Sequence, residues 1–97
     1  MAVSADNYLI DIWNIIFDIF YEGSLDLTWV NDNAKISTDN GQTWNNLGIT
    51  CTSEIGFYRC TYDWYTTAET DGLAYGLIAR ITDKADNTGY SDAVIVI

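Results

Sequence analysis

The sequence predicts one all-β domain, an antiparallel β-sandwich that spans residues 1–97. Three observations predict it: short runs of aromatic and β-branched residues, turn signals between these runs, and a length that suits one hydrophobic core. Aromatic residues make up 14% of the chain, which is a composition that favours strands. Proline is absent, so the turns must depend on glycine, asparagine and aspartate.

The first apolar stretch, residues 8–21, has two interpretations. Asp11, Asn14 and Asp18 recur at helical spacing, which indicates a helix with a narrow polar stripe. The stretch is otherwise almost wholly isoleucine and aromatic, and residues 22–24, Glu-Gly-Ser, close it like a turn. We expect a strand here, and a helix is the alternative.

Frequent turn signals divide the rest of the chain into short strands. The predicted strands are residues 25–30, 34–37, 42–44, 49–53, 57–64, 73–82 and 92–97. The predicted turns and loops are residues 31–33, 39–41, 45–48, 69–72 and 83–89. Short strands with turns at this frequency are typical of a sandwich or a barrel.

Apolar and mixed positions alternate most clearly in the predicted strand 73–82. One face carries Leu73, Tyr75, Leu77, Ala79 and Ile81. Such alternation is expected where one face of a sheet meets the core and the other meets water. We therefore expect Tyr75, Leu77, Ala79 and Ile81 in the core and Arg80 on the solvent side.

The two cysteines predict a disulfide across a hairpin. Cys51 and Cys60 are symmetric about residues 55–56, Ile-Gly, so a turn there sets the two cysteines directly opposite each other and Thr52 opposite Arg59. The Cys-x-x-Cys spacing of redox sites is absent. A disulfide in a small β-rich chain implies an oxidising compartment, so we expect an extracellular or cell-surface location.

The chain is strongly acidic, with four cations against fourteen carboxylates and a net charge of −10. This balance excludes nucleic acid as a partner, because phosphates must be neutralised by lysine and arginine. Membrane insertion is not expected either, since Asp11, Asn14 and Asp18 interrupt the longest apolar stretch and a spanning helix needs about twenty apolar residues. We interpret the acidity as a solvated surface that keeps a β-rich domain soluble.

The chemistry-bearing residues do not predict an enzyme. Histidine is absent, which removes the commonest general base and metal ligand, and a small sandwich has little room for a cleft between two carboxylates. We expect no catalytic residues and no cofactor. The alternative is a calcium site formed by Asp83, Asp86 and Asn87, whose oxygens suit that ion. Such Asx-rich loops are more often turns that their own side chains stabilise.

Residues 37–44, Ser-Thr-Asp-Asn-Gly-Gln-Thr-Trp, match the Asp-box pattern Ser-x-Asp-x-Gly-x-x-Trp. Its side chains act locally: Ser37 and Asp39 bond to their own turn, Gly41 permits positive φ, and Trp44 packs behind the turn. Because the pattern occurs once, it predicts a structural turn and not a propeller.

Several motifs in the last third of the chain occur together: Asp-Trp-Tyr-Thr-Thr at 63–67, Asp-Gly at 71–72, the alternating strand, and Thr-Asp-Lys-Ala-Asp-Asn-Thr at 82–88. They resemble the C-terminal half of bacterial and archaeal cell-surface immunoglobulin-like domains of the fibronectin type III-like kind. Residues 4–7, Ser-Ala-Asp-Asn, are a weaker second likeness. The chain departs from the family pattern at Asp86, where glycine is usual, and in the long segment 24–62.

The resemblance implies an immunoglobulin-like sandwich that acts as a spacer, an adhesion unit or a filament part. It also implies that the strand normally preceding residues 4–7 is missing. Either segment 24–62 supplies that strand, or a neighbouring copy donates it, with residues 1–23 or 93–97 as the donor. We expect donation, and hence a structural module of an extracellular assembly whose partners are identical subunits.

The alternative function is a stand-alone module that binds carbohydrate or another surface ligand. It would use aromatic side chains that the core does not need, because their rings offer apolar faces for stacking. The chain has seven tyrosines and four tryptophans, namely Trp13, Trp29, Trp44 and Trp64.

Overall fold

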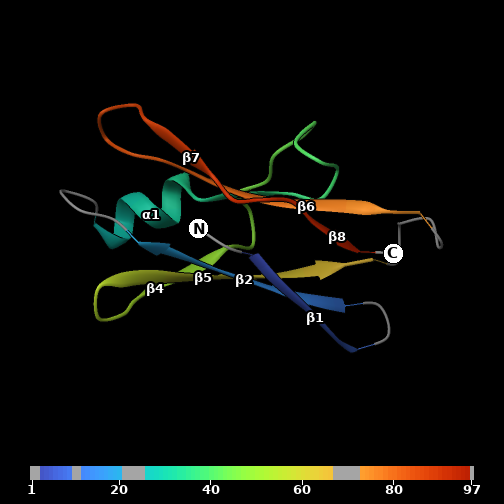
Figure 1. Ribbon diagram of the computed structural model, residues 1–97. Helices are drawn as coiled ribbons and strands as arrows, with labels where there is room; N and C mark the ends of the chain where they lie inside the picture. Colours follow the sequence, from blue (N-terminus) through green and yellow to red (C-terminus); the bar gives the residue numbers. More distant parts are fainter. Residues whose placement is uncertain (1–2, 10–11, 21–25, 67–72, 97) are drawn as a thin grey trace.

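Two antiparallel sheets face each other and enclose the core (Figure 1). The computed structural model describes residues 3–9, 12–20, 26–66 and 73–96. The first sheet has the order β1-β2-β5-β4 and consists of β1 (Val3–Leu9), β2 (Ile12–Phe20), β5 (Phe57–Tyr65) and β4 (Thr50–Ser53). The second sheet has the order β3-β6-β7 and consists of β3 (Lys35–Ser37), β6 (Tyr75–Thr82) and β7 (Thr88–Tyr90), with β8 (Val94–Val96) also paired to β6. The helix α1 (Leu27–Asn33) lies in the connection between β2 and β3.

This strand order is that of constant-type immunoglobulin sandwiches, in which sheet ABED packs on sheet CFG. Strands β1 to β6 take positions A to F in chain order, and β7 and β8 share position G along β6. The expectation that the opening strand is missing is therefore wrong, because β1 occupies that position. Segment 24–62 does not supply an additional strand before β1. Its described part forms α1, β3, β4 and the start of β5.

Strands, and not a helix, form the described part of the stretch 8–21. Strand β1 ends at Leu9 and pairs with β2, so that Leu9 lies opposite Ile12. Along β2, Ile15, Phe17 and Ile19 are buried and alternate with more exposed residues. The β-branched and aromatic composition therefore predicted the structure correctly, and the polar stripe was misleading.

The predicted strand 25–30 and turn 31–33 are wrong, because residues 27–33 form α1. The side chain of Asp26 caps the helix and accepts a hydrogen bond from the backbone N–H of Trp29 at 2.8 Å. Val30 and Ala34, four residues apart, are fully buried and face the core. Burial at this helical spacing outweighs the weak strand preference of the segment.

The remaining elements agree with the predictions except at three places. Residues 42–44 do not form the predicted strand. The segment after the turn pairs with β3 through a single antiparallel β-bridge, between Ile36 and Asn45. Strand β7 begins inside the predicted loop 83–89. Leu73 lies outside β6 and is 54% exposed, so it does not belong to the inward set. The predicted turn 69–72 lies outside the described residues.

The core draws side chains from both sheets and from α1. Its most deeply buried residues are Ile15, Phe17, Val30, Ala34, Ile36, Cys60, Leu77 and Ala79. Leu77 and Ala79 thus lie where the alternation placed them. Tyr75 and Ile81 are half-buried and pack against the core, and Tyr75 meets the buried Trp64 edge to face, with ring centroids 5.5 Å apart.

Candidate functional site

The predicted disulfide joins Cys51 on β4 to Cys60 on β5, with Cα atoms 4.0 Å apart. The hairpin has the predicted register, in which Thr52 lies opposite Arg59. Its turn is closed by the backbone N–H of Glu54, which donates to the carbonyl of Phe57 at 2.9 Å. The prediction is confirmed, and the disulfide links neighbouring strands of one sheet.

The outer edge of β4 is covered by other residues of the same chain. Asn31 of α1 lies beside Cys51 and bonds to it twice: its Oδ1 accepts from the backbone N–H at 2.8 Å, and its Nδ2 donates to the carbonyl at 3.3 Å. Ile49, just before the strand, donates its N–H to the carbonyl of Asn46 at 3.3 Å. These bonds occupy backbone groups that an added strand would need.

The outer edge of β3 is covered in a similar way. The backbone groups of Ile36 and Asn45 exchange two hydrogen bonds, each 2.9 Å long. Farther along β6, the carbonyl of Gly76 accepts a bond from the N–H of Asn40 at 2.9 Å. The segment after β3 therefore takes the place of a further strand.

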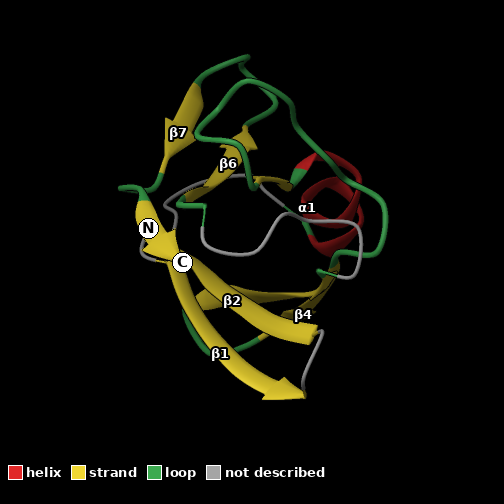
Figure 2. Ribbon diagram, turned by 90° about the vertical axis from the view of Figure 1, so that its right-hand side faces the viewer, coloured by secondary structure: helices red, strands yellow, loops and turns green. Residues whose placement is uncertain are grey.

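The other two edges are open in the described part of the chain. No described strand pairs with the outer side of β1 or with the outer sides of β7 and β8. The start of β1 and β7 lie on the side of the sandwich away from α1 (Figure 2). Strand β8 also exposes an apolar side chain, since Ile95 is 58% exposed. Open edges of this kind are templates for pairing with another chain.

The 37–44 turn has the predicted local bonds. The hydroxyl of Ser37 donates to Asp39 Oδ1 at 2.7 Å and accepts from the N–H of Gly41 at 2.8 Å. Asp39 accepts further bonds from the hydroxyl and the backbone N–H of Thr43, and these bonds lower the pKa of Asp39 to about 2. Gly41 has φ of 90°, as expected. The bonds show a structural turn, and the Asp-box assignment itself depends on the sequence pattern alone.

The predicted calcium ligands lie in the loop between β6 and β7. Asp83 Oδ1 accepts from the N–H groups of Ala85 and Asn87, each at 2.9 Å, and Oδ2 accepts from the amide of Asn87 at 3.2 Å. These bonds, with that of the Asn87 backbone foremost, lower the pKa of Asp83. No group of three or more metal-ligating acidic or cysteine side chains occurs in the described part of the chain. The bonds describe a turn that its own side chains stabilise, and the calcium site stays a prediction.

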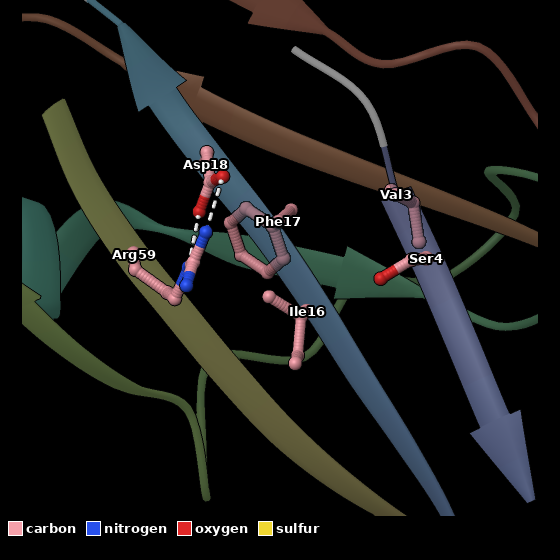
Figure 3. A pocket seen from close by; sticks show the side chains of 6 residues that line it. All are labelled: Val3, Ser4, Ile16, Phe17, Asp18 and Arg59. Carbon is pink, nitrogen blue, oxygen red and sulfur yellow. Dashed lines mark hydrogen bonds and ion pairs between the residues drawn. The ribbon is translucent and has the colours of Figure 1, made fainter.

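The outer face of the first sheet carries an ion pair between β5 and β2. Arg59 on β5 donates from Nε and Nη2 to the two carboxylate oxygens of Asp18 on β2, at 2.8 and 3.0 Å. The hydrogen bond from Arg59 lowers the pKa of Asp18. Figure 3 shows the two side chains joined to each other beside a cavity of about 330 Å³ that Val3, Ser4, Ile16 and Phe17 also line. This cavity therefore offers a ligand no uncommitted cation.

The outer face of the second sheet carries a different cluster, formed by Lys35, Trp44, Arg80 and Tyr90. In the strand registers Arg80 lies opposite Lys35 on one side and opposite Tyr90 on the other. The Arg80 guanidinium stacks on the Trp44 ring, 4.4 Å from its centroid. We refer to these four residues as the cationic row. Sequence reasoning placed Arg80 on this face but did not find the row, because its members come from three strands and a turn.

The tryptophans and tyrosines that the alternative function would use differ in their exposure. Trp64 is buried, and Trp13, Trp29 and Trp44 are half-buried. Trp29 is held by its indole N–H, which donates to the carbonyl of Thr82 at 2.8 Å. The exposed rings in the described residues belong to Phe20, Tyr65 and Tyr90.

Among the described residues, no helix has the length and apolar character needed to cross a membrane. Comparison of the chain with protein-family models, with curated proteins and with solved structures found no match. The fold and the surfaces described above are therefore the basis on which a function can be argued.

Proposed function

We propose that this protein is a non-catalytic structural module of an extracellular assembly, in which copies join through β-strand contacts. The observation that carries the proposal is that two of the four sheet edges are covered and the other two are open in the described part of the chain. The edges of β3 and β4 are covered by bonds with Asn45 and Asn31, whereas the described residues leave β1 and β7–β8 uncovered.

The form of the contact follows from the position of the open edges. The start of β1 and β7 lie on the same side of the molecule, so a strand from a neighbour can be added there to either sheet. If β1 of one copy met β7–β8 of the next, the contact would be heterologous and would propagate into a filament unless it closed a ring. The net charge of −10 opposes other, less specific contacts between copies.

The N-terminal segment is a poor candidate for a freely donated strand. Strand β2 places Ile15, Phe17 and Ile19 in the core of its own copy, so removing residues 1–21 would remove much of the first sheet. Strand β8 is a better candidate for exchange, because it is short and pairs only with β6 in the described structure. The proposal is therefore tested by substitutions at the strand edges, because deletion of residues 1–21 would disrupt the fold.

The test compares lysine substitutions at open and covered edges. Ser4→Lys on β1 and Ile95→Lys on β8 add a charge at open edges, and Thr52→Lys adds the same charge at the covered edge of β4. Size-exclusion chromatography with light scattering and electron microscopy should show large assemblies for wild type and Thr52→Lys, and smaller species for the other two variants. A wild-type protein that stays monomeric at high concentration would refute the proposal.

The alternative is a ligand-binding module, and one specific observation supports it. Tyr90, which is 58% exposed, lies beside Trp44 and Arg80 on a sheet face that no described strand or helix covers. Aromatic rings in such a position are typical of surfaces that bind extended ligands. The two functions are compatible, since one uses strand edges and the other uses a sheet face.

A further inference from the structure

The cationic row holds two of the four cations of the chain. The other two are paired with carboxylates: Arg59 with Asp18, and Lys84 with Asp26, each at 2.8 Å. Within the described residues, Lys35 and Arg80 form no ion pair. This is unexpected in a chain with fourteen carboxylates, and it makes the row the one place in the described surface where uncommitted positive charge is concentrated.

The arrangement of the two charges is itself unfavourable. Lys35 and Arg80 lie directly opposite each other on β3 and β6, and both belong to the outer face, because Ile36 and Ala79 beside them are fully buried. Like charges at directly opposed positions destabilise a sheet pair. An anion bound between them would remove this repulsion, so the pair is suited to hold a carboxylate.

The aromatic members give the row a second kind of contact. The guanidinium of Arg80 lies over the Trp44 ring, 4.4 Å from its centroid, and the rings of Trp44 and Tyr90 have centroids 5.8 Å apart at an angle of 55°. Tyr90 therefore lies at the end of the row, next to Arg80, and its exposed ring offers an apolar surface. A sugar ring has an apolar face formed by its C–H groups, which can pack on such an aromatic ring.

We propose that the cationic row binds a carboxylated carbohydrate chain. In this site a sugar carboxylate accepts hydrogen bonds from Arg80 and Lys35, and an adjacent sugar ring packs on Tyr90. Trp44 is a positioning residue, because its ring lies under the Arg80 guanidinium, 4.4 Å from it, and contacts it on one side. The inference is independent of the strand-edge contacts and goes beyond them, since it assigns a ligand to a surface that those contacts leave free.

Three other anionic partners fit the row less well. An acidic peptide binds a β-protein most readily by adding a strand at an edge, and the row lies on a face. Nucleic acid carries about one charge per 1.7 Å of duplex and is repelled by a protein of charge −10. A second copy of this chain meets its neighbour at the open strand edges in the proposed assembly, whereas the row lies on a sheet face. A sugar chain with one carboxylate per ring has a lower charge density and brings the apolar faces that Tyr90 accepts.

The test uses a four-residue oligogalacturonate and its fully methyl-esterified form, which has the same rings without the charge. Calorimetric titration of the folded protein should show binding of the free acid and at least about tenfold weaker binding of the ester. Amide shifts in a ¹⁵N-labelled sample should change around residues 35, 44, 80 and 90.

Matched variants locate the site. Arg80→Gln, Lys35→Gln and Tyr90→Ser should each weaken binding, with a loss of about tenfold for Arg80→Gln. Arg59→Gln and Tyr65→Ser make the same changes on the first sheet and should leave binding unchanged. Circular dichroism checks that all variants are folded.

Four results would overturn the inference: no binding of the free acid, equal binding of the ester, equal loss in the Arg59→Gln control, or binding of poly-glutamate as tight as that of the sugar acid. The last result would assign the row to an acidic protein partner. None of these results bears on the size of the assemblies, so the strand-edge proposal would fail or stand separately.

Discussion

At the scale of single residues, Asp39 organises the 37–44 turn. Its carboxylate accepts bonds from three donors, on Ser37 and Thr43, and all of these bonds favour its charged form. The pKa of Asp39 is lowered from 3.8 to about 2, with the hydroxyl of Thr43 as the largest cause. A carboxyl group with a lowered folded-state pKa adds stability that is fully present above its unfolded pKa.

This shift predicts the pH window in which the turn loses its contribution. The contribution should decline as the pH falls below about 4 and should be lost as the pH passes through about 2. Thermal unfolding of wild type and Asp39→Asn should therefore differ at about pH 5 and converge near pH 2. A difference between the two proteins that stays constant over this range would contradict the assignment.

Gly76 on β6 is a second residue whose identity the structure explains. A Cβ atom at this position would lie 2.6 Å from Oδ1 and 2.9 Å from Cβ of Asn40, which is closer than real Cβ contacts. Asn40 is held there by the bond from its N–H to the Gly76 carbonyl. The strand must therefore have glycine at this position so that the 37–44 turn can pack on it.

Gly76→Ala should consequently destabilise the protein by about 1–3 kcal/mol, because it overpacks this contact. Gly89→Ala on β7 is the control, since a Cβ atom there meets nothing within 4 Å. Urea unfolding measures both changes. Equal effects of the two substitutions would show that the Asn40 contact does not constrain Gly76.

At the scale of elements, the Cys51–Cys60 hairpin could be predicted almost completely from the sequence. Its strands, its register and its disulfide all follow from two cysteines placed symmetrically about a turn with glycine. The helix α1 could not be predicted in the same way, because its short sequence has no strong propensity. The signal that was present was Asp26, an N-cap residue just before Val30 and Ala34 at helical spacing.

Removing the disulfide should lower the free energy of unfolding by about 2.5–3 kcal/mol, as the chain-entropy relation gives for so short a loop. The double variant Cys51→Ala/Cys60→Ala and the reduced wild type should agree in urea unfolding. Intact mass should rise by two hydrogens on reduction. Free thiols in the oxidised protein would contradict the assignment of the disulfide.

The interaction surfaces were the least predictable elements. Alternation placed Arg80 outside, but only the pairing of β3, β6 and β7 shows that Lys35 and Tyr90 lie next to it. The same holds for edge protection: nothing in the residues around Asn31 indicates that its side chain bonds to Cys51, twenty residues later. Long-range register creates both features, and local sequence patterns carry little information about it.

At the scale of the whole molecule, the sandwich class was predictable and the strand count was not. Residues 4–7 led to the expectation of a missing first strand, because the resemblance placed them after one. They instead lie within β1, which itself completes the first sheet. Turn spacing and composition define the class of fold, whereas the role of each strand depends on its partners.

Side chains from both sheets pack in one core, and Leu77 of β6 belongs to that core with no exposed surface. Leu77→Ala should destabilise the protein by about 2–5 kcal/mol, because it leaves a cavity between the sheets. Leu47→Ala, at a position that is 81% exposed, is the control and should change stability by less than about 0.5 kcal/mol. Chemical unfolding of both variants would show whether the core is as closely packed as its burial indicates.

The position of the disulfide also has a mechanical consequence. Because Cys51 and Cys60 are neighbours within one sheet, no covalent bond between side chains crosses from the first sheet to the second in the described structure. A pulling force applied through β1 and β8 would therefore act on hydrogen bonds and apolar contacts before it reached the sulfur atoms. Once the module opened, the bridge would hold back only the few residues between 51 and 60, and the rest of the chain would be free to extend. A linear array of such modules would yield under load by lengthening, in oxidising and reducing conditions alike.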